Sequence, residues 1–582
     1  MKFRLNGSAA LLFAATTHLQ MTLVQSSNPK IVVDHTQTFQ PFYGCGASWT
    51  DTSAWILNGD RANPSTDPRT LSDSERDEII QALFSKSGDG IGLDVLRQPM
   101  GTSDFRWWDY TYEDVRGSFS TASDNSYIIP TILQTLQENP NVKVLALPWS
   151  APAWAKENNS LNGGGLKSND NAVLQDYHDY FVDFVDAYTA EGIPIWAISV
   201  QNEPQHESWD YPTMTLSPAE HGDLIQGVRA ALDAAQHDAI KVVGYDHNWD
   251  TPDYVRDTLN GNAAARNAVS AIAFHCYGGG VEAQSQIKAE FPEVEIWFTE
   301  CTEHGESSSF NGDFRWALRE LVIGTTKHWA STVLEWNLVL MEGGGPKIPG
   351  GCENCRGLID VQYDGGYRKN PAYYALGHLS KFVQSDAVEA TKRIASTEPT
   401  SNTKTMAMLN PDGSSFVIIL NDGYPDVTLD LDWMSAICTV TVPSWSAVTV
   451  FRPSGSTTMQ VWRTTDQQSQ TRLTFTENVN CVSNGPSPTA TPTGAPVPVP
   501  VTPSPVETPS ASPTKAPTDA PTTSSPTTAP TDAPTFAPSE APTKSPTATP
   551  TAAPTKAPAS SPPPPTSSPT KFPVEPPTSS PT

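Results

Sequence analysis

Short apolar runs and amphipathic stretches alternate along most of this chain. The runs have the length of buried strands, and several stretches between them carry apolar residues at helical spacing. Capping patterns at Ser72 and Glu75, and at Ser217 and Glu220, open two of the helices. Eight strand-like runs occupy residues 42–48, 93–98, 142–147, 194–201, 240–244, 269–274, 296–299 and 332–336. Eight strand–helix units predict an α/β fold, a (β/α)8 TIM barrel over residues 42–379.

The pattern changes after residue 379. Two strand-like runs, residues 406–409 and 416–420, flank the turn sequence Asn-Pro-Asp-Gly and predict a hairpin. A further strand follows, and no long helix intervenes. These features predict a β-sandwich over residues 380–484, which the strand-like residues 27–41 join from the other end of the chain.

The two ends of the chain differ in composition from the rest. Residues 1–26 begin with Lys2 and Arg4 and continue into a short apolar run, which is typical of a secretory signal peptide. Residues 485–582 hold more than half of the 53 prolines, with threonine, serine and alanine between them. Such a segment cannot bury a core, and we expect a disordered Pro/Thr/Ser-rich stalk that is O-glycosylated. The protein is therefore predicted to be secreted.

The net charge of −27 limits the classes of binding partner that this chain favours. Nearly all of it precedes the stalk, and so acidic a body does not favour nucleic acid or an anionic membrane surface. No run outside the N-terminus is long and apolar enough to span a bilayer, so we expect no stable membrane insertion. A neutral ligand fits this charge, and association with a cell wall or matrix through the stalk is a further hypothesis.

The seven cysteines fit a secreted chain. Cys352 and Cys355 form a Cys-x-x-Cys pair, interpreted as a local disulfide because no second pair completes a zinc site. Cys438 and Cys481 are a second candidate pair. The remaining cysteines lie in apolar, strand-like contexts and are expected to be buried thiols. They are Cys45, Cys276 and Cys301.

Two of the predicted strands end in a carboxylate. One leads into the sequence Asn-Glu-Pro, which contains Glu203, and another leads into Glu300. The carboxyl ends of parallel barrel strands share one rim, so both side chains are predicted to meet there. Paired carboxylates are what glycoside hydrolysis needs, because one protonates the departing oxygen and the other attacks the sugar or activates water.

The same rim is rich in aromatic and amide side chains. Tryptophans follow the third strand and end the eighth, and His275 and Tyr277 follow the sixth. Aromatic rings offer flat apolar surfaces to the C–H faces of sugars, whereas amides and acids bind hydroxyls. His275 and His206 raise the alternative of a metal site. No Cys/His/Asp spacing supports it, so neither a metal nor another cofactor is predicted.

Together these segments resemble glycoside hydrolase family 30, which includes glucosylceramidases and endo-β-1,6-glucanases. The resemblance covers about residues 30–453, in order, and does not extend to the stalk. It is carried by residues 42–51, 96–100, 147–154, 200–204, 275–277, 298–301 and 336–337.

The resemblance implies a retaining mechanism, with Glu203 as the acid/base and Glu300 as the nucleophile. It implies that Asn202 binds the sugar 2-hydroxyl beside the nucleophile and that Arg97 supports the nucleophile from behind. The terminal sugar would be bound by Asp51, Trp149 and Trp336. His275 and Tyr277 would flank the nucleophile.

The leading hypothesis is therefore a secreted, retaining β-glycosidase that cleaves β-glucosidic bonds, as glucosylceramidases do. An endo-β-1,6-glucanase acting on wall glucan is the alternative, because both substrates need the same chemistry at the cleaved bond. The chain differs from the mammalian-type lipid hydrolases at Cys276, where they carry tryptophan, and in the cysteine-bearing loop at residues 347–355. A non-catalytic, glycan-binding barrel is the second alternative.

Overall fold

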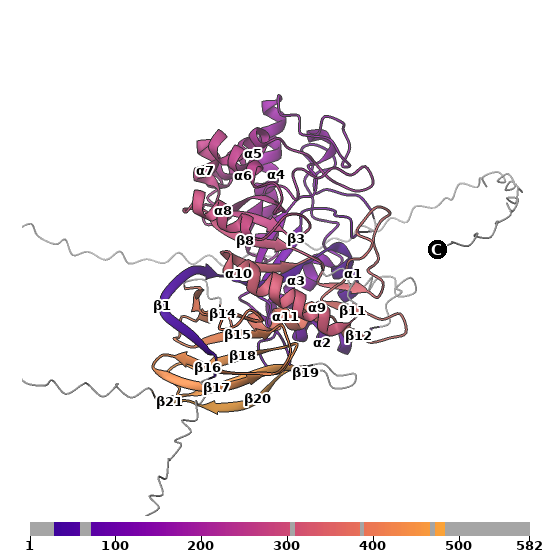
Figure 1. Ribbon diagram of the computed structural model, residues 1–582. Coiled ribbons are helices and arrows are strands. Elements are labelled where there is room, and N and C mark those ends of the chain that lie inside the picture. The colour runs from indigo at the N-terminus through magenta and orange to yellow at the C-terminus, as the bar shows by residue number, and fades with distance from the viewer. Residues whose placement is uncertain are drawn as a thin grey trace, which may run out of the picture. The chain divides into compact units, whose positions relative to one another are not determined.

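The computed structural model describes residues 28–58, 71–106, 108–302, 309–384, 389–465 and 472–483. Both predicted domains, the (β/α)8 barrel and the β-sandwich, are present in this part of the chain (Figure 1). The predicted signal peptide and the Pro/Thr/Ser-rich stalk lie outside the described residues. Secretion and the nature of the stalk therefore stay predictions.

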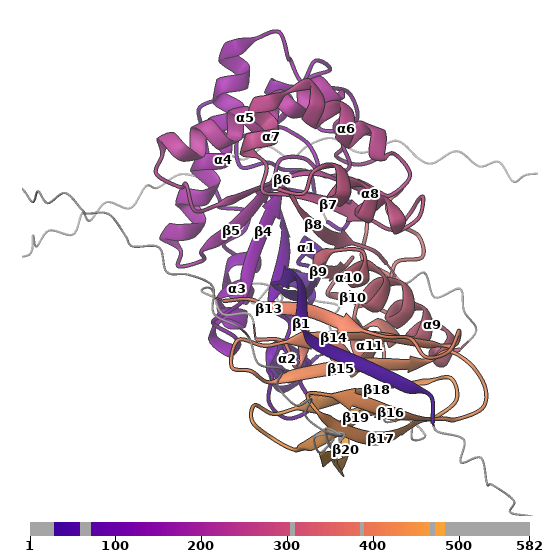
Figure 2. The ribbon, with the colours of Figure 1, turned by 60° about the vertical axis from the view of Figure 1, so that its left-hand side comes forward.

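Eight parallel strands of the described chain close a barrel in sequential order (Figures 1 and 2). Each overlaps one of the eight predicted runs. Nearly all of their residues are buried on both faces, which explains why the runs are continuously apolar. The strands are β2 Gly44–Ser48, β3 Val95–Pro99, β4 Lys143–Leu147, β5 Ile195–Ser199, β6 Lys241–Asn248, β7 Ala271–His275, β8 Glu295–Glu300 and β9 Ala330–Glu335.

Small side chains and one indole fill the inside of the barrel. Ala197, Ala271 and Ala273 pack with Trp297, which is fully buried. The indole of Trp297 also stacks on Trp196, with 4.4 Å between ring centroids. The barrel is therefore a packed core at this level rather than a pore.

Helices surround the barrel (Figure 2). Both predicted capping boxes are formed, at Ser72 before α2 and at Ser217 before α5. The described helices are α1 Asp51–Asn58, α2 Asp73–Phe84, α3 Ile128–Glu138, α4 Asn171–Ala190, α5 Pro218–Ala234, α6 Pro252–Gly261, α7 Ala263–Ala268, α8 Glu282–Glu290, α9 Phe310–Trp316, α10 Thr325–Lys327 and α11 Pro371–Ser380, with a 3-10 turn at Ala153–Ala155 and a π-helical segment at Ala317–Gly324.

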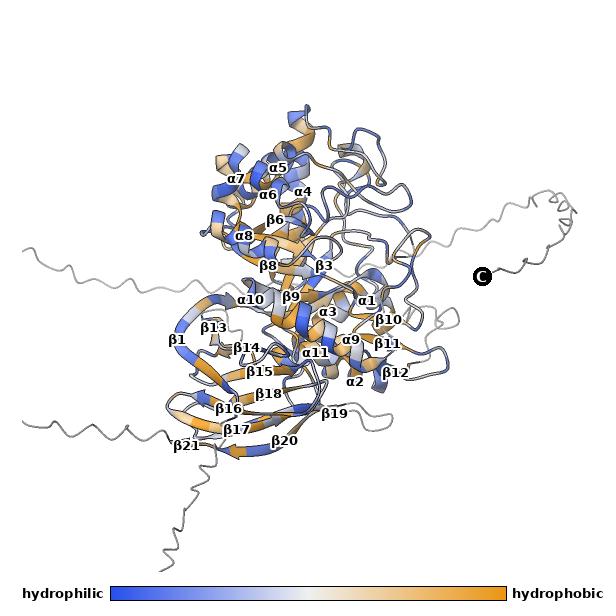
Figure 3. Cartoon of the chain, viewed as in Figure 1, coloured by the Kyte–Doolittle hydropathy of each residue, from blue (hydrophilic) through white to orange (hydrophobic). Residues whose placement is uncertain are grey.

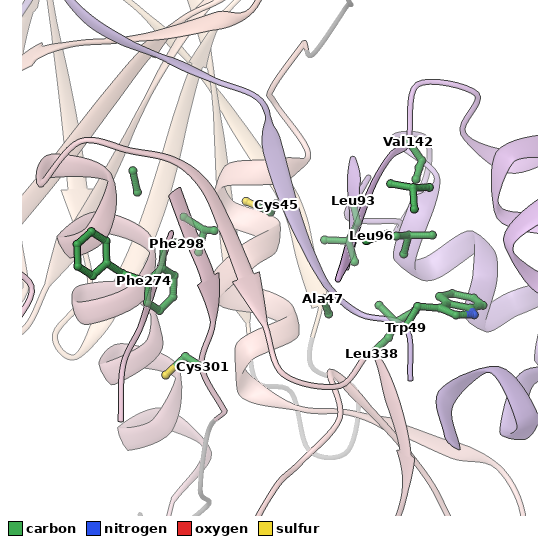
Figure 4. Close-up of a cluster of buried hydrophobic side chains, with 14 of the residues drawn as sticks. Cys45, Ala47, Trp49, Leu93, Leu96, Val142, Phe274, Phe298, Cys301 and Leu338 are labelled. Atoms are coloured by element: carbon green, nitrogen blue, oxygen red, sulfur yellow. The ribbon is translucent and has the colours of Figure 1, made fainter. Parts of the chain in front are cut away.

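Figure 3 shows the layering: the barrel strands are largely hydrophobic, and the surrounding helices carry hydrophilic residues. Figure 4 shows part of the packing around the strands. Leu93, Leu96 and Trp49 lie together there, and Phe274 lies close to Phe298. In the described residues, no helix combines the length and the apolar character needed to cross a membrane.

The β-sandwich is one ten-stranded sheet that folds over on itself, because β17 contacts β15, β18 and β20 without pairing with them. Strand β1 lies inside this sheet, antiparallel to β13 and parallel to β16. The predicted hairpin is β14–β15. The strands are β1 Lys30–Phe42, β13 Thr391–Ser396, β14 Thr403–Leu409, β15 Ser415–Asn421, β16 Val427–Trp433, β17 Ala436–Val442, β18 Ser446–Arg452, β19 Thr458–Thr465, β20 Arg472–Asn480 and β21 Val482–Ser483.

Helix α11 joins the barrel to the sandwich. Every residue of this helix is buried. The two ring nitrogens of its His378 lie 2.9 Å and 3.0 Å from the hydroxyls of Thr449 and Thr464 in the sandwich. Asp422 of the sandwich also accepts hydrogen bonds from Arg315 and Arg319 on the barrel side. A small sheet, β10 Val339–Met341, β11 Ile359–Val361 and β12 Tyr367–Lys369, follows the last barrel strand.

Candidate active site

A cavity of about 320 Å³ opens at the C-terminal ends of the barrel strands. Most of the predicted site residues line it, and His275 and Arg97 contact that lining from behind. The lining residues lie at or beyond the ends of six barrel strands, β4 to β9, and in the connections that follow β3 and β10. They are Asp104, Trp149, Asn202, Glu203, His206, Tyr211, His247, Asn248, Tyr277, Glu300, Trp336, Gly350, Cys352 and Cys355.

Glu203 and Glu300 meet around one histidine. Oε1 of Glu203 lies 2.9 Å from Nδ1 of His275, and Oε1 of Glu300 lies 4.0 Å from the same nitrogen. The two carboxylate oxygens can therefore be no more than about 7 Å apart, the sum of these distances. A carboxyl separation of about 5 Å is typical of retaining glycosidases, and inverting enzymes need a longer one.

The guanidinium of Arg97 ties several strand ends together. Arg97 is fully buried, and its Nη1 donates to Oε2 of Glu300. Its Nη2 donates to Oδ1 of Asn202 at 2.7 Å and to Oδ2 of Asp246 at 3.1 Å. The hydroxyl of Tyr277 donates to Oε1 of Glu300 at 3.0 Å. Each oxygen of Glu300 thus accepts a bond that fixes its position.

His275 connects Glu203 to another buried carboxylate. Its Nδ1 lies 2.9 Å from Oε1 of Glu203, and its Nε2 lies 2.9 Å from Oδ1 of Asp246. Burial disfavours the imidazolium, but the charge of Glu300 and the hydrogen bonds to Asp246 and Glu203 outweigh it and raise the pKa of His275 to about 9. At neutral pH, His275 therefore carries a proton on both ring nitrogens.

The pKa values of the two glutamates are shifted in opposite directions. Burial raises the pKa of Glu300, against the lowering effects of His275 and Arg97. Burial alone would raise the pKa of Glu203, but the hydrogen bond with His275 and the nearby imidazole of His247 outweigh it and hold that pKa well below its usual range. Because the two carboxylates lie close to each other and to His275, the ionisation of one affects the other. In this arrangement, the proton nearest to Glu203 resides on His275.

Backbone strain is concentrated beside these groups. Glu203 has a φ of 45°, and Tyr245 and Asp246 have φ values of 69° and 53°, in the left-handed region that side chains rarely adopt. The amide of Glu203 donates to the carbonyl of Asp246 at 3.1 Å, so the strained segments hold each other. The pairing of β6 with β7 shifts between Tyr245 and His247. The irregularity turns Asp246 toward His275 and places Nδ1 of His247 3.5 Å from Glu203.

Two tryptophans form one wall of the cavity. The rings of Trp149 and Trp336 stack, with 5.2 Å between centroids and 28° between planes. The guanidinium of Arg97 lies 5.1 Å and 5.9 Å from the two ring centroids. A flat apolar surface beside hydrogen-bonding groups fits the C–H face of a sugar ring.

The acidic side chain at this wall is Asp104 rather than Asp51. Oδ2 of Asp104 accepts from the amide of Cys352 at 3.1 Å, and burial raises the pKa of Asp104 to about 7. Among the described residues, the lining of the cavity does not include Asp51. Asp51 accepts from the hydroxyl of Tyr110 at 3.1 Å, and burial, with the charge of Asp124, raises its pKa to about 8. Asp104 is therefore better placed than Asp51 to bind a sugar hydroxyl.

Sequence reasoning missed Asp104, Asp246 and His247. The predicted strand ended at residue 244, whereas β6 continues to Asn248. In the sequence, the successive polar residues at the end of β6 resemble a turn. Only the irregular pairing of β6 with β7 brings them to the rim. Asp104 lies in the long connection between β3 and α3, where no local periodicity marks a site residue. The one feature of the sequence that could have indicated Asp104 is its carboxylate, which lies seven residues after Arg97.

One group of ligand-type side chains lies in the site. A carboxylate oxygen of Glu203 and ring nitrogens of His247 and His275 lie within 4.8 Å of one another. Both ring nitrogens of His275 lie 2.9 Å from carboxylate oxygens, those of Glu203 and Asp246, so each already has a hydrogen-bond partner. The three side chains fit a hydrogen-bond network better than a metal site. The absence of a metal or other cofactor stays a prediction.

All seven cysteines lie in the described residues. Cys352 pairs with Cys355 and Cys438 pairs with Cys481, as the sequence predicts. Cys45 is buried and unpaired.

The prediction of buried thiols is wrong for Cys276 and Cys301, which form a disulfide. These residues directly follow His275 and Glu300, which are partners in the pairing of β7 with β8. The two cysteines are 25 residues apart in the sequence, and only the parallel pairing of β7 with β8 places them side by side. The apolar context that suggested thiols instead reflects the buried strand ends.

Family comparison agrees with this fold. Residues 59–383 match the profile described as the glycosyl hydrolase family 30 TIM-barrel domain. The chain belongs to glycosyl hydrolase family 30. Residues 391–450 match the β-sandwich domain of the same family. This family 30 protein is therefore a glycoside hydrolase.

The proteins similar to this family 30 hydrolase include endo-1,6-β-glucanases and glucosylceramidases. An endo-1,6-β-D-glucanase from Aspergillus fumigatus is 32% identical over 69% of this chain and 83% of its own length. The lysosomal acid glucosylceramidase of Mus musculus is 28% identical over 73% of this chain and 82% of its own length. A solved endo-β1,6-glucanase structure has a TM-score of 0.66 and 28% identity, covering 74% of this chain and 94% of that one.

Proposed function

We propose that this family 30 hydrolase cleaves β-glucosidic bonds with retention of configuration, through a covalent glycosyl intermediate on Glu300. The observation that carries the proposal is the position of the two carboxylates. Glu203 and Glu300 come from the ends of β5 and β8 and lie within about 7 Å of each other at one cavity. This distance suits direct attack by one carboxylate at the anomeric carbon better than an intervening water.

In the first step, Glu300 attacks the anomeric carbon while Glu203 protonates the departing oxygen. Glu203 needs a proton for this step, and the nearest one lies on Nδ1 of His275, 2.9 Å away. Transfer along that hydrogen bond leaves a neutral imidazole, which still donates from Nε2 to Asp246. In the second step, Glu203 accepts a proton from the water that attacks the sugar–Glu300 ester.

Neighbouring groups hold the sugar during these steps. The Oδ1 of Asn202 accepts from Arg97, so the amide nitrogen of Asn202 is the group that donates to the sugar 2-hydroxyl. The stacked rings of Trp149 and Trp336 provide an apolar surface, and Asp104 accepts from a hydroxyl farther from the cleaved bond.

A β-1,6-linked glucan is the substrate that we propose first. Support comes from the endo-1,6-β-D-glucanase of Aspergillus fumigatus at 32% identity and from the solved endo-β1,6-glucanase at a TM-score of 0.66. Glucosylceramide is the second candidate, supported by the similarity to the mouse lysosomal acid glucosylceramidase. Both substrates present a β-glucosyl group to the same pair of carboxylates, and they differ in what occupies the rest of the cavity.

One screen separates these candidates. The purified protein is incubated with β-1,6-glucan, with glucosylceramide in detergent and with an aryl β-glucoside. Released sugars are sized to distinguish internal from terminal cleavage, and the first anomer formed is read by NMR. We expect β-anomeric products, with short oligosaccharides from the glucan. An α-anomer formed first would exclude the double displacement, and release from glucosylceramide alone would exclude the glucan.

A glycan-binding barrel without turnover is the remaining alternative. It predicts saturable binding to a glucan with no product from any of the three substrates.

We also propose that the protein is secreted. The three disulfides support an oxidising compartment. Expression in a eukaryotic host should release the protein into the medium with its N-terminal segment removed, and N-terminal sequencing would show an intact Met1 if this is wrong.

A further inference from the structure

One disulfide lies directly against the candidate catalytic groups. Cys276 stands between His275 and Tyr277, and Cys301 follows Glu300. The bond therefore links the end of β7 to the end of β8, one residue beyond the last paired residues of these strands. Cys301 is fully buried, and Cys276 packs against the same apolar cluster.

The residues beside this disulfide make the bonds that define the site. The hydroxyl of Tyr277 donates to Oε1 of Glu300 at 3.0 Å, across the two linked strands. His275 bonds to Glu203 at 2.9 Å and lies 4.0 Å from Glu300. A shift of one strand end against the other would change both sets of distances together.

The backbone pairing between the two linked strands is irregular at this point. The pairing of β7 with β8 is regular from Ala271 to Phe274 and shifts before His275. Beyond it, the amide of Tyr277 donates to Oδ1 of Asn248 on β6. Tyr277 itself is 39% exposed, so part of this residue faces the solvent. A covalent link next to an irregular, partly exposed strand end restricts how far Tyr277 can move from Glu300.

We propose that the Cys276–Cys301 disulfide is a positioning element of the active site, which holds Tyr277 and His275 in register with Glu300. The oxidised chain is then the fully active form. The disulfide makes no contact with substrate and acts through Tyr277. This inference rests on the proposed hydrolase activity, because the position of Glu300 matters only if Glu300 reacts.

The chain offers a matched control in the sandwich. Cys438 and Cys481 form a disulfide that joins β17 to the segment before β21, within the other domain. We compare Cys276→Ala/Cys301→Ala with Cys438→Ala/Cys481→Ala in the full chain. Both variants lose one disulfide and should lose stability, because each removes a covalent constraint on the unfolded chain. Thermal unfolding and circular dichroism record that shared effect.

The kinetic effect should differ between the two. With an aryl β-glucoside, the rim variant should lose roughly tenfold to hundredfold in kcat with a smaller change in KM, since small misplacements of reacting groups have effects of that size. The sandwich variant should keep the wild-type kcat below its unfolding temperature. Equal kcat values in the wild type and the folded rim variant would overturn the inference. A wild type that is inactive on β-1,6-glucan, on glucosylceramide and on the aryl β-glucoside would instead overturn the proposed function.

A double-mutant cycle tests the route through Tyr277. Tyr277→Phe should cost less in the Cys276→Ala/Cys301→Ala background than in the wild type, because the hydroxyl is already displaced there. Additive losses would show that the disulfide does not act through Tyr277. If the rim variant fails to fold, the wild type is reduced in steps with dithiothreitol, and activity is followed against the thiols that mass spectrometry identifies. Activity should fall with the appearance of Cys276 and Cys301 thiols, and full activity after their reduction would contradict the proposal.

Discussion

The barrel rim and the β-sandwich bury very different side chains. At the rim, Arg97, Asp246 and His275 are fully buried and joined by ion pairs and hydrogen bonds. The core between the sandwich layers, in the part of the chain that the structure describes, consists of aliphatic residues with Trp433, Cys438 and Met459. Burying charge costs far more than burying hydrocarbon unless each charge has partners. The rim offsets much of that cost by pairing its buried charges, whereas the sandwich core avoids the cost.

The two regions also place left-handed backbone differently. In the sandwich, Met434 and Ser435 have φ values of 50° and 63° and form the two-residue turn between β16 and β17, where a hairpin requires such values. At the rim, Glu203 and Asp246 adopt them beside the cavity. In the sandwich, the left-handed residues thus allow the chain to reverse direction. At the rim, they orient side chains toward the cavity. Four predictions test this contrast, each through a change at the rim.

The largest effect is expected from Glu300→Gln. The amide is nearly isosteric but cannot form the sugar ester, so kcat should fall by roughly 10³-fold or more. Glu477→Gln in β20 is the matched control, because Glu477 makes an exposed ion pair with Arg463 in the sandwich. It should leave kcat unchanged. Hydrolysis of an aryl β-glucoside measures both, and near-normal turnover by the Glu300 variant would refute the nucleophile assignment.

The next largest effect is expected from Glu203→Ala, and it should depend on the leaving group. Losing the acid should slow natural glucosides by about 10²- to 10⁴-fold, because their departing oxygen needs a proton. An aryl glucoside with an acidic phenol should suffer much less in the first step. A rate series over phenols of different pKa measures this, and equal losses across the series would contradict the acid role.

Stability against pH should distinguish two buried histidines. His275 at the rim has its pKa raised to about 9, so its contribution is complete below pH 6.5 and is lost as the pH rises through 9. Burial lowers the pKa of His378 in α11 to about 3, so its contribution is complete above pH 6.5 and is lost as the pH falls toward 3. For His275, the change is roughly 3 kcal/mol.

Urea unfolding from pH 4 to pH 10 measures both effects. His275→Gln should flatten the alkaline side of the stability profile, and His378→Gln should flatten the acidic side. If His275→Gln leaves the alkaline side unchanged, the histidine is not held as an imidazolium by Glu203 and Asp246.

The smallest effect concerns Asp104 and Asp51. Asp104→Asn should raise KM about tenfold with a smaller change in kcat, because one well-placed hydrogen bond to a charged group is worth roughly 1.5 kcal/mol. Asp51→Asn should leave KM unchanged, because the side chain bonds to Tyr110 instead of lining the cavity. Initial rates over a range of glucan concentrations measure both. A larger KM effect at Asp51 would support the sugar-binding role that the family resemblance implies for it.

The features that sequence predicted well share a physical cause. Each barrel strand is buried on both faces, so its apolar run is visible without knowledge of its neighbours. Glu203 and Glu300 were found because each interrupts such a run at its end. Family 30 membership followed from the same strand ends.

The features that sequence missed depend on neighbours across strands. Asp246 and His247 lie at the rim only because β6 continues past an irregularity in its pairing with β7. Cys276 and Cys301 pair only because two strand ends lie side by side. Asp104 reaches the cavity from a connection without periodicity, held by the amide of Cys352. None of these relations is encoded in local spacing.

The position of β1 has a consequence for biosynthesis. This strand leaves the ribosome before any part of the barrel, yet its parallel partner β16 begins at Val427. The backbone hydrogen bonds of β1 to β13 and β16 can therefore form only after the whole barrel has been translated. During that interval the nascent chain exposes an unpaired strand, and a chaperone that binds extended segments would have most to protect at this end.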